Sequence, residues 1–417
     1  MKVGFLGLSH LGQVYSAVTA HQGVSVVQFD ADAEIVSELK SHGPSVVEPG
    51  LDDLWLASFP NRTLTADPEE LRGCDLLFVV SDVITDEFGV SDLTKVRQLM
   101  DVALATSSSD CPVIVRSQVP PGFSRQYASD SRQVLYQVET LVFSEAVSRA
   151  MNPDRHIIGS HERNAALPGV YLEWLKMFAA PIHVMTYESA ELAKISINLL
   201  LAASVSTANS LAELCEKIGA DWTEIVPALQ ADPRIGRFAY LKPGLGISGG
   251  NLERDLASFC SLALRYSVSD VVISSFIAHS EFRKSFVSQQ LAELGGLGGQ
   301  QVGMIGLSYK PGTASLKNSP SLDVLRSFPN QRFLVHDPAA RVTGFPHVRQ
   351  VEDVTEILAS CKTLLIMTPW PQYINELNSD DGWMRTISLI IDPYSVISRE
   401  TLRNFDGIYR VLGSSGA

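Results

Sequence analysis

The sequence predicts an α/β protein with two Rossmann-like parallel-sheet domains joined by a central helical domain that contains one long helix. Short β-branched runs alternate with helical patterns over the first part of the chain, as in parallel βαβ units. One long helical pattern follows at about 188–218, with further helical segments to about 294. After the glycine-rich connection at 295–301 the strand rhythm returns. The expected domains are an N-terminal α/β domain (1–185), a central helical domain (186–294) and a C-terminal α/β domain (295–417).

The composition is that of a globular chain of two or three domains. The chain has 417 residues, of which 45% are hydrophobic and 19% charged, and this excludes a chain dominated by disorder. The 33 basic and 46 acidic residues give a net charge of −13, which disfavours nucleic acid or an anionic membrane as the main partner. An anionic ligand would therefore depend on local basic groups or helix N-termini.

The cysteines and the N-terminal segment indicate a reduced, cytoplasmic protein. The five cysteines are scattered, without the spacing of a CxxC pair or a zinc site, so we expect structural thiols and no metal centre. The segment MKVGFLGLSHLG enters a strand directly and lacks the features of a signal peptide. Residues 195–212 contain no charge, but seven polar residues interrupt them, which favours a buried helix over a membrane span.

The first expected strand leads into a dinucleotide-binding fingerprint. Residues 7–12 read GLSHLG, a G-x-G-x-x-G pattern with Ser9 at the middle glycine position. Asp30, at the end of the second strand, supplies the carboxylate expected to bond the ribose hydroxyls of NAD and to repel the extra phosphate of NADP. The alternative is an ordinary strand–turn–helix in which the glycines only permit packing. The cofactor residues expected here are Gly7, Ser9, Leu11, Gly12 and Asp30.

Separated motifs make the whole chain resemble the UDP-glucose/GDP-mannose dehydrogenase family. They are EPGL at 48–51, SQVPPG at 117–122, NPDR at 152–155, AELAK at 190–194 with Asn198, DPRIG at 232–236, GLSYKP at 306–311 and Ser319-Pro320. The resemblance implies oxidation of the C6 alcohol of a nucleotide sugar to an acid by two molecules of NAD in succession. A family cysteine captures the intermediate aldehyde, and the thioester that follows is hydrolysed.

The catalytic loop departs from the family at the nucleophile. The family pattern PGxGxGGSCFPKDL reads here PGLGISGGNLERDL at 243–256, so Asn251 occupies the cysteine position. An amide forms no thioester. Cys260 lies nine residues further on, about 13 Å of helical rise away, which makes it an unlikely substitute.

Other departures affect the same chemistry or the binding of substrate. Gln118 replaces a threonine that in the family helps to hold the active-site water, and Phe143 replaces a second glutamate. Lys317 and Tyr394 stand where the family has arginines. Because lysine and arginine differ at a bidentate phosphate site, the sugar or its nucleotide can differ too.

Several polar residues of the family site are retained. Lys194 and Asn198 lie four apart on one helical face, and Glu139 and Asp255 are also present. The resemblance implies that this group moves the proton of the reacting hydroxyl and steadies the oxyanion; the alternative is a buried ion pair with Asp255 as a helix cap. The expected catalytic residues are thus Lys194, Asn198, Glu139, Asp255 and Asn251. The expected substrate-binding residues are Glu139, Lys194, Asn198, Arg234, Gly246, Gly250, Lys310 and Lys317, and Ser117 and Gln118 join the cofactor site. His10, His156 and His183 are expected to be structural.

Loss of the nucleophile predicts chemistry limited to two electrons. The first expectation is redox-neutral epimerisation of a ring carbinol of a nucleotide-diphosphate sugar, with C4 as the candidate carbon, through a ketone that is reduced again in place by retained NAD. The alternatives are a two-electron dehydrogenase that releases a carbonyl product, a four-electron 6-dehydrogenase, and a non-catalytic nucleotide-sugar binder. A homodimer is expected because the long helix is apolar and because Arg234 in the family reaches a sugar bound by the neighbouring subunit.

Overall fold

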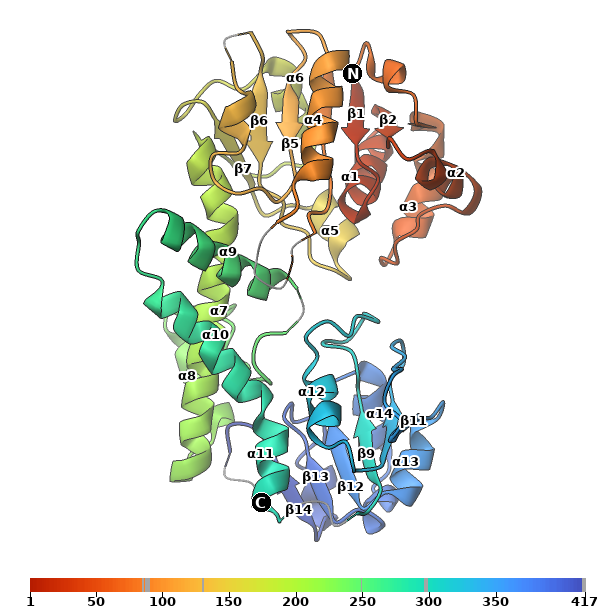
Figure 1. Cartoon of the computed structure of the whole chain (residues 1–417), viewed down its shortest axis with the longest axis vertical. Coiled ribbons are helices and arrows are strands. Elements are labelled where there is room, and N and C mark those ends of the chain that lie inside the picture. The colour runs from red at the N-terminus through yellow and green to blue at the C-terminus, as the bar shows by residue number, and fades with distance from the viewer. Residues whose placement is uncertain (85, 87–90, 130, 249, 296–298, 415–417) are drawn as a thin grey trace. The chain divides into compact units, whose positions relative to one another are not determined.

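The computed structural model describes residues 1–417 except 85, 87–90, 130, 249, 296–298 and 415–417 (Figure 1). The side chain of Asn251 also lies outside the described part. The chain divides into two compact units, Met1–Ile197 and Asn198–Ala417.

The first unit is built on an eight-stranded sheet of order β3-β2-β1-β4-β5-β6-β7-β8. The strand pairs are parallel except β6 with β7, which is antiparallel. The strands are β1 (Lys2–Leu6), β2 (Ser25–Phe29), β3 (Arg62–Thr65), β4 (Leu76–Val79), β5 (Val113–Val115), β6 (Val134–Gln137), β7 (His156–Ser160) and β8 (Ile182–Thr186). The helices are α1 (His10–His21), α2 (Ala33–His42), α3 (Leu51–Ala57), α4 (Thr94–Thr106), α5 (Ala146–Met151), α6 (Gly169–Lys176) and α7 (Tyr187–Ile218), which continues into the second unit.

Both faces of this sheet are covered, as the continuous apolar strands require. Strand β4 shows why: Leu76 and Phe78 pack into a core with α1, α5 and α6, whereas Leu77 and Val79 pack into a second core with α4. Successive side chains of a strand point to opposite faces, so one apolar run supplies both cores. The rings of Phe5 and Phe78 stack across neighbouring strands with centroids 4.9 Å apart.

The second unit combines helices with a six-stranded parallel sheet of order β11-β10-β9-β12-β13-β14. The helices are α8 (Trp222–Ala231), α9 (Asn251–Arg265), α10 (Val271–Lys284), α11 (Phe286–Glu293), α12 (Pro320–Ser327), α13 (Val354–Ser360) and α14 (Pro371–Ser379). The strands are β9 (Val302–Ile305), β10 (Phe333–His336), β11 (Val348–Gln350), β12 (Thr363–Ile366), β13 (Leu389–Ile391) and β14 (Ile408–Arg410). The predicted fold class, two parallel-sheet domains with helices including one long helix, is confirmed.

The long helix α7 has 32 residues. Among the helices of the described residues, it is the one that is long and apolar enough to cross a membrane. Core helices of other proteins meet the same criterion. In its most apolar window 33% of the residues are buried, so the expected helix is present but only partly buried.

Candidate functional site

The turn between β1 and α1 has a geometry that requires glycine. Gly7 has φ +102° and its N–H donates to the Phe29 carbonyl at 2.8 Å. A Cβ on Gly7 would lie 2.2 Å from the carbonyl oxygen of Val80, and a Cβ on Gly12 would lie 1.8 Å from the carbonyl oxygen of Gly7. Neither distance is tolerable for a backbone neighbour, so the two outer glycines of the fingerprint are explained by close backbone approach.

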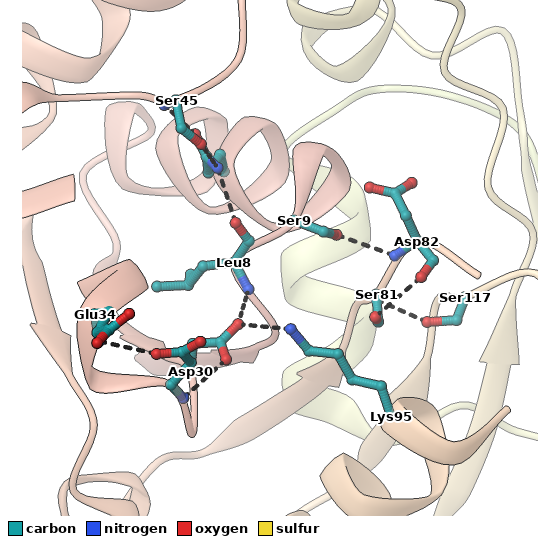
Figure 2. Close-up of polar contacts among 11 residues, drawn as sticks. Leu8, Ser9, Asp30, Glu34, Ser45, Ser81, Asp82, Lys95 and Ser117 are labelled. Carbon is teal, nitrogen blue, oxygen red and sulfur yellow. Dashed lines mark hydrogen bonds and ion pairs between the residues drawn. The ribbon is translucent and has the colours of Figure 1, made fainter. Parts of the chain in front are cut away.

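Ser9, in the middle glycine position, is the N-cap residue of α1. Its hydroxyl accepts a hydrogen bond from the Asp82 N–H at 3.0 Å, as Figure 2 shows, and so points to the loop after β4 instead of capping the helix. The first-turn amides of α1 are therefore left to an anionic ligand. Leu11 is buried in the core beneath this turn, so its side chain serves packing.

Asp30 follows β2 and is held on both carboxylate oxygens (Figure 2). Oδ2 accepts from the Leu8 N–H at 2.9 Å and lies 3.2 Å from the Lys95 ammonium, while Oδ1 accepts from the Asp32 N–H at 3.2 Å. Lys95 lies 65 residues further along the chain, on α4. Sequence reasoning missed Lys95, because no local pattern links it to Asp30.

Ser117 joins the same edge of the sheet. Its hydroxyl accepts from the Ser81 N–H at 2.8 Å, which ties the end of β5 to the end of β4, and Gln118 beside it is half-buried. Strand order reverses between β1 and β4, and ligands of open α/β sheets bind at the carboxyl ends of such strands. The residues present fit a dinucleotide: an uncapped helix N-terminus for the pyrophosphate and a carboxylate at the end of β2 for the ribose.

A second polar cluster of the first unit lies around Glu139. Its Oε2 is 3.6 Å from the Lys194 ammonium, and the two side chains are only 11% and 13% exposed. Its Oε1 accepts from the Tyr15 hydroxyl at 3.5 Å and from the Leu141 N–H. The expected association of Glu139 with Lys194 is thus present, while their roles in catalysis remain predictions.

Tyr15 and Arg116 extend this cluster and were not identified from the sequence. The Arg116 guanidinium lies 3.4 Å from the centroid of the Tyr15 ring, and its Nε and Nη1 have no hydrogen-bond partner among the described residues. Burial raises the pKa of Tyr15 far above its usual value, so Tyr15 stays protonated and donates to Glu139. Burial, with the charge of Arg116, lowers the pKa of His156 to about 4.

Asn198 and Asp255 form a pair within the second unit. The Asn198 side-chain amide donates to Asp255 Oδ2 at 2.5 Å, and Arg254 Nε donates to Asp255 Oδ1 at 3.2 Å. Asp255 is buried and lies inside α9, so it is not the helix cap that the structural alternative required.

The glycine-rich loop before α9 is fixed by close packing. Gly246 has φ +69°, and a Cβ there would lie 2.4 Å from the Ser280 carbonyl oxygen. The Ile247 N–H donates to the Ser280 hydroxyl at 2.7 Å. Gly250 is the N-cap of α9, and a Cβ on it would lie 3.6 Å from the Lys317 ammonium. Gly250 and Lys317 are therefore neighbours, and their binding of a common ligand stays a prediction.

Two further expected substrate residues, Arg234 and Lys310, have contacts of their own in the second unit. Arg234 forms a salt bridge with Asp232 at 2.5 Å on an exposed turn, and Lys310 lies 5.8 Å from the centroid of the Tyr309 ring. Phe143, at the position of a family glutamate, stacks on His10 with ring centroids 4.7 Å apart.

The environments of the five thiols, all in the described part of the chain, disfavour the thiolate form. Burial raises the pKa of every one, that of Cys74 to about 11 and that of Cys111 to about 12. Cys260 is half-buried and its sulfur lies 3.8 Å from the Ser274 hydroxyl. Because the thiolate is the nucleophilic form, none of these environments activates a cysteine.

Three domain models of one family match the chain. They are described as the NAD binding domain, the central domain and the UDP binding domain of the UDP-glucose/GDP-mannose dehydrogenase family, and they match residues 1–175, 188–280 and 303–399.

Individual relatives match over nearly the full length. The UDP-glucose 6-dehydrogenase TuaD of Bacillus subtilis is 27% identical over 99% of this chain and 93% of its own length, and a UDP-glucose 6-dehydrogenase of Rickettsia typhi is 26% identical over 99% and 100%. The structure of a UDP-glucose dehydrogenase from the archaeon Pyrobaculum islandicum is similar with a TM-score of 0.82 at 27% identity, over 93% of this chain and 96% of that one. A UDP-D-ManNAc dehydrogenase of Pyrococcus horikoshii has a TM-score of 0.84 at 20% identity, over 100% of both chains, and supports the fold alone.

Proposed function

Because this chain belongs to the UDP-glucose/GDP-mannose dehydrogenase family, we propose that it is an NAD-dependent enzyme that acts on a nucleotide sugar through a single hydride transfer. The observation that carries the limit to one hydride is the amide of Asn251 at the position of the family nucleophile, and the burial of the thiols supports it. Burial raises the pKa of all five thiols. Without a thiolate, an aldehyde is not held as a thiohemiacetal, so the covalent hydride donor of the family's second oxidation is missing.

The first unit supplies the groups for such a step. Bound NAD would accept the hydride from the carbinol carbon. The hydroxyl proton must leave at the same time, and Glu139 offers a carboxylate to receive it. The Lys194 ammonium, 3.6 Å from this carboxylate, stabilises the developing alkoxide. Tyr15 donates to the other oxygen of Glu139 and so fixes its orientation. The product is a carbonyl compound, with one NADH and one proton released.

Net oxidation is favoured over epimerisation. The relatives named above are dehydrogenases, and none supports epimerisation, the first expectation from the sequence. The match of residues 303–399 to a UDP binding domain supports a nucleoside-diphosphate sugar as substrate. Its proposed contacts are Arg234, Gly246, Gly250, Lys310 and Lys317. Asn198 and Asp255 remain proposed as catalytic.

The proposed state of the protein is a homodimer in the cytoplasm, in which each chain has three domains. Large apolar side chains line one stripe of α7 and are exposed: Leu200, Leu211, Leu214 and Ile218. Their spacing of 11, 3 and 4 residues places them on one helical face, and a second copy of the chain would cover them. Each family model lies within one of the proposed domains 1–185, 186–294 and 295–417.

The product decides between these chemistries. The purified protein is incubated with NAD and a panel of nucleotide sugars, and NADH absorbance is followed together with product mass. One NADH per sugar and a loss of two mass units is the expected result. An isomer of unchanged mass without net NADH would establish epimerisation instead, and a uronic acid with two NADH would overturn the limit to one hydride.

A further inference from the structure

Lys95 occupies a position that local helix energetics disfavour. It is the second residue of α4, where the positive end of the helix dipole opposes a lysine. The cost is offset by Asp30, whose Oδ2 lies 3.2 Å from the Lys95 ammonium. A residue that breaks a local rule and is compensated by a site residue is a candidate for function.

The two side chains of this pair differ in their exposure to solvent. The Asp30 side chain is 1% exposed, whereas that of Lys95 is 45% exposed. A ligand that approaches the end of β2 therefore meets a neutral ion pair with an accessible cation. The nearby carboxylate of Asp32 accepts from the Glu34 N–H at 2.9 Å as the cap of α2, on an exposed turn where solvent and salt weaken its field.

The second sheet provides an internal comparison. Asp337 follows β10 as Asp30 follows β2, and its Oδ2 likewise accepts from the Leu307 N–H, at 2.7 Å. There the further donors to Oδ2 are all neutral: the Ser308 N–H at 3.0 Å, the Ser308 hydroxyl at 3.1 Å and Trp370 Nε1 at 3.2 Å. The same structural carboxylate is thus satisfied by neutral groups in one sheet and by a cation in the other, so the fold does not require a lysine at this place.

We propose that Lys95 makes the adenosine-ribose end of the cofactor site accept a 2′-phosphate, so that the protein binds NADP as well as NAD. The carboxylate of Asp30 alone would repel that phosphate. Lys95 cancels its charge and offers the phosphate a charge-assisted hydrogen bond. The inference concerns only the dinucleotide site, to which the NAD binding domain match assigns the cofactor, and it does not depend on the sugar or on the number of hydrides.

Equilibrium binding tests this without turnover. Dissociation constants of NAD and NADP are measured by calorimetry for the full-length protein, for Lys95→Met and for a matched control, Arg97→Met. Arg97 lies on the same helix but contacts Gln126 and Tyr127, so its variant loses one positive charge away from Asp30. Circular dichroism and melting curves establish that the variants are folded.

The wild-type protein is expected to bind NADP within about tenfold of NAD. Lys95→Met should weaken NADP by about tenfold, as for a partly screened charge pair, and NAD by less than about threefold, while Arg97→Met changes neither. Higher salt should weaken NADP more than NAD. The proposal is overturned if the wild type binds NADP more than about a hundredfold more weakly than NAD, or if Lys95→Met weakens both nucleotides equally. Absence of NAD binding would instead refute the cofactor site itself.

Discussion

The ammonium of Lys194 lies 3.6 Å from the carboxylate of Glu139. Lys194 belongs to α7 and Glu139 follows β6, 55 residues earlier in the chain. Both side chains are largely withdrawn from solvent, and at this depth a charge pair is weakly screened. The pair is thus suited to stabilise an alkoxide that forms beside it. Substitution of Lys194 distinguishes a catalytic role of the pair from a structural one.

Lys194→Ala should lower turnover by about a hundredfold or more, the usual contribution of a group that handles a proton or its charge, and should leave NAD affinity unchanged. Steady-state rates and NAD titrations measure the two effects. Lys217→Ala removes an exposed lysine of the same helix and serves as the control. Wild-type turnover in a destabilised Lys194→Ala protein would mean that the ion pair is structural.

Gly12→Ala should destabilise the first unit by about 1–3 kcal/mol, as overpacking does, and weaken NAD binding by more than about tenfold. The new Cβ would lie 1.8 Å from the Gly7 carbonyl oxygen, so the fingerprint turn must open. Gly169→Ala is the matched control, because nothing lies within 4 Å of its Cβ and its φ is not positive. Urea denaturation and calorimetry measure both variants; equal behaviour of the two would contradict the close-approach explanation.

The cysteines of the native protein should be alkylated slowly. At pH 7.5 the native protein is expected to react with iodoacetamide far more slowly than free cysteine, since burial raises the pKa of each thiol. Cys260→Ser should retain turnover within about twofold. Rapid modification of one cysteine with matching loss of activity would reveal a nucleophile and restore the second oxidation step.

Stability should fall as the pH drops from 6.5 towards 4. His156 has its pKa lowered to about 4 in the folded chain, so between these values the unfolded chain binds the extra proton, and stability is lost with decreasing pH. The effect approaches about 3 kcal/mol at pH 4 and below.

His156→Phe keeps a ring in the contact with Trp174 and removes this titration. Urea denaturation at pH 7 and pH 4.5 should show a smaller pH difference in the variant than in the wild type. An unchanged difference would assign the acid sensitivity to other groups.

The sequence by itself determined the fold class and the main features of the dinucleotide turn. Continuous apolar strands such as β4 require cover on both faces. The glycine spacing of residues 7–12 predicts the turn in which the structure places the Gly7 carbonyl oxygen 1.8 Å from a Cβ on Gly12. These constraints are local, so residues that are close in the sequence are enough to predict them. The absence of cysteine at Asn251 could also be read directly, because the loop motif around it is contiguous.

The tertiary structure alone decided the contacts that lie outside the recognised motifs. Lys95 reaches Asp30 across 65 residues and Tyr15 reaches Glu139 across 124, and no periodicity or motif marks either residue. Arg116 at the end of β5 stacks on Tyr15 of α1 only because α1 packs on the sheet. Such contacts depend on how the helices pack on the strands. Packing interactions of many residues together fix that geometry, and no single local preference does so.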